Sequence, residues 1–467
     1  YANLFKIVIT FFLSIGFLGV ISNLSYYFNK DINFVVNIFY FVSVIGLIIF
    51  LKTKKKFIIN FNDLFKDNQF LWFLVFLILL IHLNRIFVEW NDQDEISQYG
   101  YYTKLYAQGW LLKDEVFGLF PRFAEISFSL FYYFTDNFLL ARFIRFLIFC
   151  GCLIIFYITC FSLTNSKKIS LIASIIFILI PEFSYVGFHS MKTDFLLFAY
   201  ELTSIIFIIF LCKNFLDKNK RTDYFSETIF FAIIFGLLAF TARLSGIYIL
   251  LISCVLFLLQ MPLSNKRKNV IYISYLIFLF LIIPFPQILF NIIIFENPFY
   301  PMKGFWIKFF SSPKFAEGWS VYHLKEAYNL SLGIPVINEI YVLIYNSLGL
   351  SRTYFGFVQD NFVNPKSFGS TGWISPVTLI LFVTPFYFRK LKIITILTIF
   401  FLLLFLFWKS NIQYTRIFLA SSCIALIVFA VIYNYEKSKK SWFYHFLKAL
   451  TFLTIFLLTI YHLEVSI

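Results

Sequence analysis

Carboxylates gather in one short segment of this otherwise apolar chain. Glu89, Asp92, Asp94 and Glu95 fall within seven residues, although the 467-residue chain has only 24 Asp and Glu in total. A carboxylate with an ordinary pKa of about 4 is ionised at neutral pH, so it can accept a proton from a hydroxyl group. The segment is therefore the first candidate for acid–base chemistry. The alternative is a solvated loop, which needs polar residues in any case.

A second acidic candidate is Asp194, which follows a nearby cation, Lys192, in a short polar turn. Aspartate is a favoured N-cap, so Asp194 either caps the next helix or faces the first acidic segment and shares its ligand. Both interpretations remain open at the level of sequence.

Several arginines flank apolar segments on the side of the chain where these acidic residues fall. They are Arg142, Arg145, Arg243 and Arg416. The planar guanidinium group binds phosphate through paired hydrogen bonds, so these residues are candidates for holding a phosphate group. The alternative is that each extends its charged head from an apolar helix to lipid headgroups.

Motifs for other chemistries are missing from the sequence. It contains no phosphate-binding P-loop and no glycine-rich dinucleotide fingerprint. Its six cysteines lie in or beside apolar runs, without the spacing of a zinc site or of a disulfide framework. We interpret them as small apolar residues. No segment large enough to bind a nucleotide sugar is predicted on the side of the basic clusters.

The elements that must position these residues are membrane-spanning helices. Hydrophobic residues make up 60% of the chain and charged residues only 13%, about half the charged fraction of a soluble domain. The apolar runs are long enough to cross a bilayer. We predict an all-α polytopic membrane protein of about thirteen spans. The expected spans are 4–27, 33–51, 70–89, 138–163, 169–187, 194–212, 227–242, 246–261, 270–291, 375–388, 391–407, 412–434 and 443–463.

The net charge of +15 follows from basic clusters between these spans. With the predicted spans, every strong cluster falls on one face, which the positive-inside rule assigns to the cytoplasm. The charge therefore does not indicate a nucleic-acid partner. The clusters are residues 52–56, 167–168, 213–221, 266–268, 389–392 and 437–440.

Two long polar segments, 90–137 and 292–374, then share the opposite, extracytoplasmic face. Parts of the first segment, near 97–108 and 122–134, have the pattern of amphipathic helices lying on the membrane surface. We divide the chain into an N-terminal helix pair with a basic loop, 1–69, and a main transmembrane domain, 70–467.

Motifs in a fixed order along residues 90–420 resemble the GT-C superfamily of membrane glycosyltransferases, in particular the branch of bacterial protein mannosyltransferases and aminoarabinose transferases. The acidic pair Asp94-Glu95 before Tyr99 resembles the loop motif of that branch. The remaining similar motifs are Phe120-Pro121-Arg122-Phe123-Ala124-Glu125, Ala141-Arg142-Phe143, Lys192-Thr193-Asp194, Asn297-Pro298-Phe299-Tyr300-Pro301 and Gln413-Tyr414-Thr415-Arg416. The acidic loop follows the third span here rather than the first, which leaves the role of residues 1–69 open.

The resemblance implies transfer of a sugar from a polyprenyl-phosphate donor to a glycan, lipid or protein acceptor. The reaction would take place on the extracytoplasmic face of a membrane, most naturally the bacterial inner membrane. Direct attack at the anomeric carbon would invert its configuration. The scheme requires no cofactor, although some relatives use a divalent metal ion.

The same resemblance assigns roles to individual residues. Asp94 would be the base, with Asp92 or Glu95 as the alternative. Positioning of donor or acceptor would fall to three residues of the later motifs, Asp194, Lys192 and Asn297. Binding of the lipid phosphate would fall to the arginines Arg243, Arg416 and Arg142.

Other classes of protein share parts of this pattern. A lipid-linked glycan polymerase or ligase also has about a dozen spans and large outer loops. A transporter of lipid-linked sugars would show polar residues deep in its spans and related halves. We expect neither feature, and in particular no acidic residue in the middle of a span. A non-catalytic structural subunit is the remaining alternative.

Overall fold

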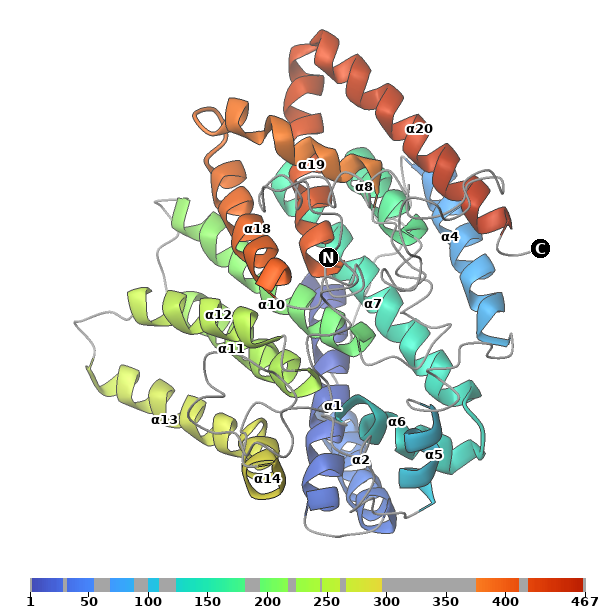
Figure 1. Ribbon diagram of the computed structural model, residues 1–467, viewed down its shortest axis with the longest axis vertical. Helices are drawn as coiled ribbons and strands as arrows, with labels where there is room; N and C mark the ends of the chain where they lie inside the picture. The colour runs from blue at the N-terminus through green and yellow to red at the C-terminus, as the bar shows by residue number, and fades with distance from the viewer. Residues whose placement is uncertain are drawn as a thin grey trace.

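A computed structural model describes residues 2–27, 32–53, 68–87, 100–108, 123–180, 194–216, 224–243, 246–260, 266–295, 375–410 and 419–464. Helices account for nearly all of these residues, which include no β-strand (Figure 1). The elements are α1 (Ala2–Tyr27), α2 (Ile32–Thr53), α4 (Gln69–Asn84), η1 (Arg85–Phe87), α5 (Gly100–Ala107), α6 (Phe123–Thr135), α7 (Leu139–Thr164), α8 (Lys167–Leu179), α10 (Asp194–Leu216), α11 (Tyr224–Ala242), α12 (Ile247–Gln260), α13 (Lys266–Ile282), α14 (Phe285–Phe295), η9 (Pro376–Tyr387), α18 (Lys392–Ser410), α19 (Leu419–Lys439) and α20 (Trp442–Glu464).

Long apolar helices mark the chain as an integral membrane protein. Within the described residues, α1, α7, α10, α19 and α20 are long and apolar enough to cross a bilayer, and the bent pair α13–α14 makes a sixth candidate. A helix satisfies its own backbone hydrogen bonds, so it is the natural way for such apolar sequence to lie in lipid. The other apolar segments that the sequence singled out also contain helices, but the apolar stretches described within these are shorter.

Hydrogen bonds between helices fix the direction in which each one runs. His82 of α4 bonds through Nε2 to the carbonyl oxygen of Ile178 in α8 at 2.8 Å, so these two helices end side by side. Asn434 of α19 donates to the carbonyl oxygen of Thr164, the last residue of α7, at 2.9 Å. Lys213 of α10 donates to the Ser162 carbonyl oxygen near the same end of α7.

These contacts define two ends of the helix bundle. We call one the α6 end, where α7 and α10 begin and α4 and α8 finish. The other is the basic end, where α7, α10 and α19 finish. The predicted clusters 167–168, 389–392 and 437–440 all meet at the basic end, where Tyr387 donates to Glu436 at 3.0 Å. These three clusters therefore lie at one end of the bundle, as the sequence predicts, and the assignment of that end to the cytoplasmic face stays a prediction.

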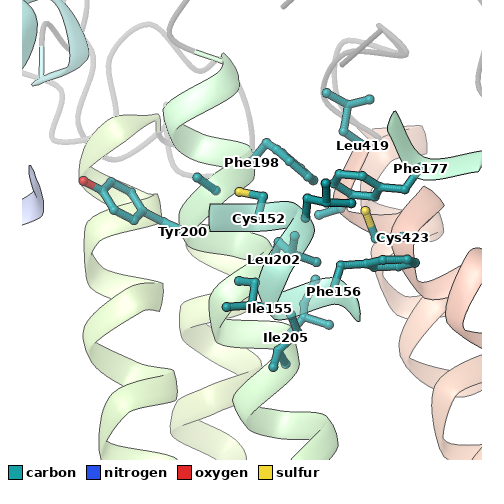
Figure 2. Packing of buried hydrophobic residues seen from close by; sticks show 14 of the residues in the cluster. Cys152, Ile155, Phe156, Phe177, Phe198, Tyr200, Leu202, Ile205, Leu419 and Cys423 are labelled. Carbon is teal, nitrogen blue, oxygen red and sulfur yellow. The ribbon is translucent and has the colours of Figure 1, made fainter. Parts of the chain in front are cut away.

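The core lies where α7, α8, α10 and α19 meet (Figure 2). The rings of Phe156 and Phe177 stack with centroids 4.8 Å apart, and Phe177 also contacts Phe198 at 6.3 Å. Cys152 and Cys423 are fully buried beside these rings. All six cysteines are free thiols, as their interpretation as small apolar residues requires.

Helix α1 is part of this core, which answers part of the question that the sequence left open for residues 1–69. Its small residues allow close packing on three neighbours. A Cβ atom on Gly16 would lie 2.6 Å from a methyl group of Leu238 in α11. A Cβ atom on Gly19 would lie 2.5 Å from the ring of Phe123 in α6, and Phe12 packs against Gly151 of α7. Close contact of this kind is how helices associate in lipid.

The expected span 270–291 is interrupted, because α13 and α14 meet at a 45° bend. Pro284 and Pro286 lie at the break. Proline removes a backbone donor and clashes with the preceding turn, which explains the bend. The sequence prediction of one continuous helix here is wrong. The expected span 375–388 also differs in detail, since η9 is a 3-10 helix with Pro376 at its start and Pro385 inside.

The two expected surface helices are present as α5 and α6, but α6 differs from a helix that lies on a surface. Every residue of α6 from Phe123 to Tyr132 is buried. It packs against α1, α5 and α7, so protein covers it on several sides (Figure 1). Its apolar bulk therefore contributes to the bundle and not only to a membrane-facing side.

Candidate functional site

Buried ionisable side chains lie on both α6 and α7 at the α6 end. Arg145 of α7 is fully buried, and its guanidinium carbon lies 5.4 Å from the ring centroid of Phe128 in α6 and 5.4 Å from that of Phe195 in α10. Two aromatic faces thus hold the cation by cation–π attraction, which is strong where water is excluded. Arg145 ties α6 to the first turn of α10.

Arg142 lies one turn before Arg145 and is only 8% exposed. Its Nη1 donates to the carbonyl oxygen of Ile86 at 2.9 Å. Ile86 belongs to η1 and lies three residues before Glu89, the first residue of the acidic segment. Arg142 therefore anchors η1, the element before the acidic segment, through a contact that the sequence did not indicate. Its predicted role in phosphate binding stays a prediction.

Glu125 is a buried carboxyl group in the first turn of α6 and is 2% exposed. It lies three residues before Phe128, so both side chains belong to one face of the helix, the face that meets Arg145. A carboxylate in the first turn also interacts favourably with the helix dipole. In the sequence, Glu125 marked only the start of a surface helix. The tertiary structure makes it part of the candidate site.

Buried hydroxyl groups also lie on α5 and α6. Tyr102, Tyr106 and Ile126 form a small cluster of their own, where α5 packs on α6. Thr103, Ser127 and Ser129 are fully buried. The hydroxyl groups of Ser127 and Ser129 donate to carbonyl oxygens of their own helix, so this end of the bundle has a polar interior without requiring a ligand for them.

Asp194 and Arg243 lie at the same level because α10 and α11 run antiparallel. Ser204 of α10 donates to the carbonyl oxygen of Ala232 in α11 at 2.7 Å, which fixes their register. With this register, the first residue of α10, Asp194, lies at about the same height along the bundle as the residue that follows α11, Arg243. The side chain of Asp194 is not among the parts of the chain that the structure describes.

The backbone holds Arg243 in a tight turn. Its N–H donates to the carbonyl oxygen of Ala239 at 3.0 Å, and its own carbonyl oxygen accepts from the N–H of Gly246 at 2.9 Å. A Cβ atom on Gly246 would lie 2.5 Å from the Ala239 carbonyl oxygen. Only glycine fits there, so the close contact of α11 and α12 determines where Arg243 lies.

The other predicted site residues lie outside the described residues. These are Asp92, Asp94, Glu95, Lys192, Asn297 and Arg416. Described helices flank each of the segments that contain them, and α10 begins two residues after Lys192. η1 ends shortly before the acidic segment, α14 ends two residues before Asn297, and α19 begins three residues after Arg416 at the end opposite its contact with Thr164.

Glu201 was missed by the sequence analysis, although the signal was in the sequence. It lies inside the predicted span 194–212 and is buried in α10 with 6% exposure. The expectation that no acidic residue lies in the middle of a span is therefore wrong. One turn further on, Ser204 lies 3.3 Å from Ser253 of α12, so the interior of these spans is polar in places.

Among the described residues, no three His, Cys, Asp or Glu side chains gather as a metal site would require. The acidic segment from Glu89 to Glu95 lies outside the described residues. The metal requirement therefore stays a prediction.

Fold and site together define an all-helical integral membrane protein with a buried polar site at the α6 end. Comparisons with known proteins return no match, whether with protein-family models, curated proteins or solved structures.

Proposed function

We propose that this chain is a membrane glycosyltransferase of about thirteen spans that moves a sugar from a polyprenyl-phosphate donor to an extracytoplasmic acceptor. The observation that carries the proposal is the meeting of helix ends at the α6 end. Arg142, Arg145 and the carboxyl group of Glu125 are buried at this end. Asp194 and Arg243 lie there at about the same height along the bundle. These are the residue types that a phosphate-bearing donor and a hydroxyl acceptor require.

In this scheme, Asp94 removes the proton from the acceptor hydroxyl group, while Asp92 and Glu95 are its alternatives. The acceptor oxygen attacks the anomeric carbon, and the bond from that carbon to the phosphate oxygen breaks. The anomeric configuration inverts through an oxocarbenium-like transition state. Polyprenyl phosphate leaves with the electron pair, and its negative charge is stabilised by Arg243 and Arg416. Asp194, Lys192 and Asn297 position the reactants.

Mass spectrometry of envelope glycans and glycolipids tests the proposal. A deletion strain is complemented with the wild type, with Asp94→Asn, or with Asp136→Asn as the matched control. Asp136 is an exposed carboxylate in the turn before α7 with a positive φ of 50°, which asparagine tolerates. We expect a sugar to disappear on deletion and to return with the wild type and the control only.

Each other outcome has a definite meaning. If Asp94→Asn restores the sugar at matched protein levels, Asp94 is not the base. If deletion changes no glycan or glycolipid, the transferase proposal fails.

A second candidate function, transport of a lipid-linked sugar, is favoured by two observations. Glu201 is a buried carboxyl group within a span, and α13–α14 is a broken helix of the kind that forms binding sites in transporters. Proteoliposomes carrying a fluorescent short-chain prenyl-phosphate sugar separate the two functions. Movement of the probe across the bilayer that is lost in Glu201→Gln would support transport, whereas a transferase moves no probe without an acceptor.

A further inference from the structure

The exposure pattern of α14 is the reverse of that of a helix in a soluble protein. Between residues 285 and 293, only Gln287 and Asn291 are fully buried, at 4% and 2% exposure. They are four residues apart, so they lie on one face of the helix. The exposed side chains are Leu289, Ile292 and Ile293, all apolar. A helix that presents apolar groups outward and amides inward faces lipid on one side and a polar interior on the other.

The amide of Gln287 has nothing to bond to among the residues that the structure describes. Both its nitrogen and its oxygen are buried without a hydrogen-bond partner. A buried amide in this state is costly, and the cost is greatest in an apolar environment. Unsatisfied groups of this kind are rare in native proteins and require an explanation, such as a ligand that completes their hydrogen bonds.

The position of α14 connects Gln287 with the candidate site. α14 follows the 45° bend, packs against α1 and ends two residues before Asn297 (Figure 1). The last turns of α1 add a further buried amide, Asn23, whose Oδ1 also has no partner within the described residues. Breaks in membrane helices free backbone and side chains for ligands, and binding sites recur at them.

We propose that Gln287 hydrogen-bonds the sugar hydroxyl groups of the lipid-linked donor, with α14 as one wall of the donor site. The inference rests on the proposed function. An amide offers one acceptor and two donors, which suit neighbouring hydroxyl groups, whereas a phosphate would need the charge of an arginine. The exposed apolar side of the same helix faces lipid, from which a donor with a prenyl chain enters. An acceptor that enters from water would not need a binding site beside a lipid-facing helix.

Binding of two probes to the purified protein tests the inference without relying on catalysis. The first probe is a panel of C10-prenyl phosphates that carry a hexose or a pentose, and the second is the same prenyl phosphate without a sugar. We expect the wild type to bind at least one sugar-bearing probe more tightly than the sugar-free one. Gln287→Met keeps the length of the side chain and removes its polar atoms. It should weaken binding of the preferred sugar-bearing probe by about tenfold and leave the sugar-free probe unchanged.

Thr454→Val is the matched control, because Thr454 of α20 also has a buried side-chain oxygen with no partner in the described part of the chain. Gln287→Met removes two unsatisfied polar atoms and Thr454→Val removes one, so both should leave the thermal midpoint equal to or above that of the wild type. Only Gln287→Met should lose the preference for the sugar.

The outcomes separate the inference from the proposed function. If the wild type binds neither probe, the polyprenyl-phosphate donor is wrong, and the inference fails with it. If the wild type binds both probes equally, or Gln287→Met keeps the preference, the donor can stand but Gln287 does not bind its sugar.

Discussion

Replacing Gly246 by alanine should damage the protein far more than the same change at Gly16. Both glycines pack against neighbouring residues of α11. A Cβ atom on Gly246 would lie 2.5 Å from the carbonyl oxygen of Ala239 and 2.6 Å from the backbone nitrogen of Phe240. A Cβ atom on Gly16 would lie 2.6 Å from a side-chain methyl group of Leu238. Backbone cannot move aside within a helix, whereas a leucine side chain can adjust.

The expected loss of folding stability follows from this difference between backbone and side-chain neighbours. Ordinary van der Waals contact begins at 3.4 Å, so α12 must move from α11 by about 1 Å, and overpacking of this kind costs about 1–3 kcal/mol. Gly16 lies inside α1, where alanine is favoured over glycine by about 0.5–1 kcal/mol, which offsets the adjustment of Leu238. We expect Gly246→Ala to be less stable than Gly16→Ala by at least about 1 kcal/mol.

Thiol labelling during heating measures this difference. Cys152, Cys160 and Cys423 are free and fully buried, so a thiol-reactive dye labels them only as the bundle opens. Gly246→Ala should be labelled at a lower temperature than Gly16→Ala. It should also reduce any transferase activity, because the contact with α12 holds the turn of Arg243. If Gly246→Ala proves as stable as Gly16→Ala, or more stable, the steric argument is refuted.

Three further predictions concern single contacts, and the same labelling assay measures each. Arg145→Lys should lose about 1–2 kcal/mol, because lysine cannot lie flat between Phe128 and Phe195; an unchanged midpoint would contradict the cation–π interpretation. His82→Leu should cost about 1–3 kcal/mol by removing the bond from α4 to the carbonyl oxygen of Ile178 in α8. Asn165→Ala should cost about 1 kcal/mol, since φ is 53° at this left-handed cap and alanine tolerates that region poorly; the change to glycine should cost less.

The sequence determined the class of the protein and the places of its helices. Helices occupy each of the apolar segments that the sequence singled out, because long apolar runs have few other ways to satisfy their backbone. It also indicated the common face of the basic clusters 167–168, 389–392 and 437–440, since alternating spans place every second turn on one side. These properties depend on local sequence, so hydrophobic runs and the placement of charged residues indicate them directly.

Two features that the sequence analysis missed, a broken span and a buried carboxyl group, were also marked by local signals in the sequence. Pro284 and Pro286 mark the break between α13 and α14. Glu201 lies plainly inside a predicted span. Both would have qualified the view that the spans are continuous and free of acidic residues.

Only the tertiary structure decided which polar residues meet. Phe128, Arg145 and Phe195 come from three helices, and no spacing in the sequence relates them. The burial of α6 follows from α1, whose glycines let it approach closely, and the unsatisfied amide of Gln287 follows from the side of α14 that turns inward. Periodicity reports that a helix has a polar side, but which neighbour that side meets depends on packing between residues far apart in the chain.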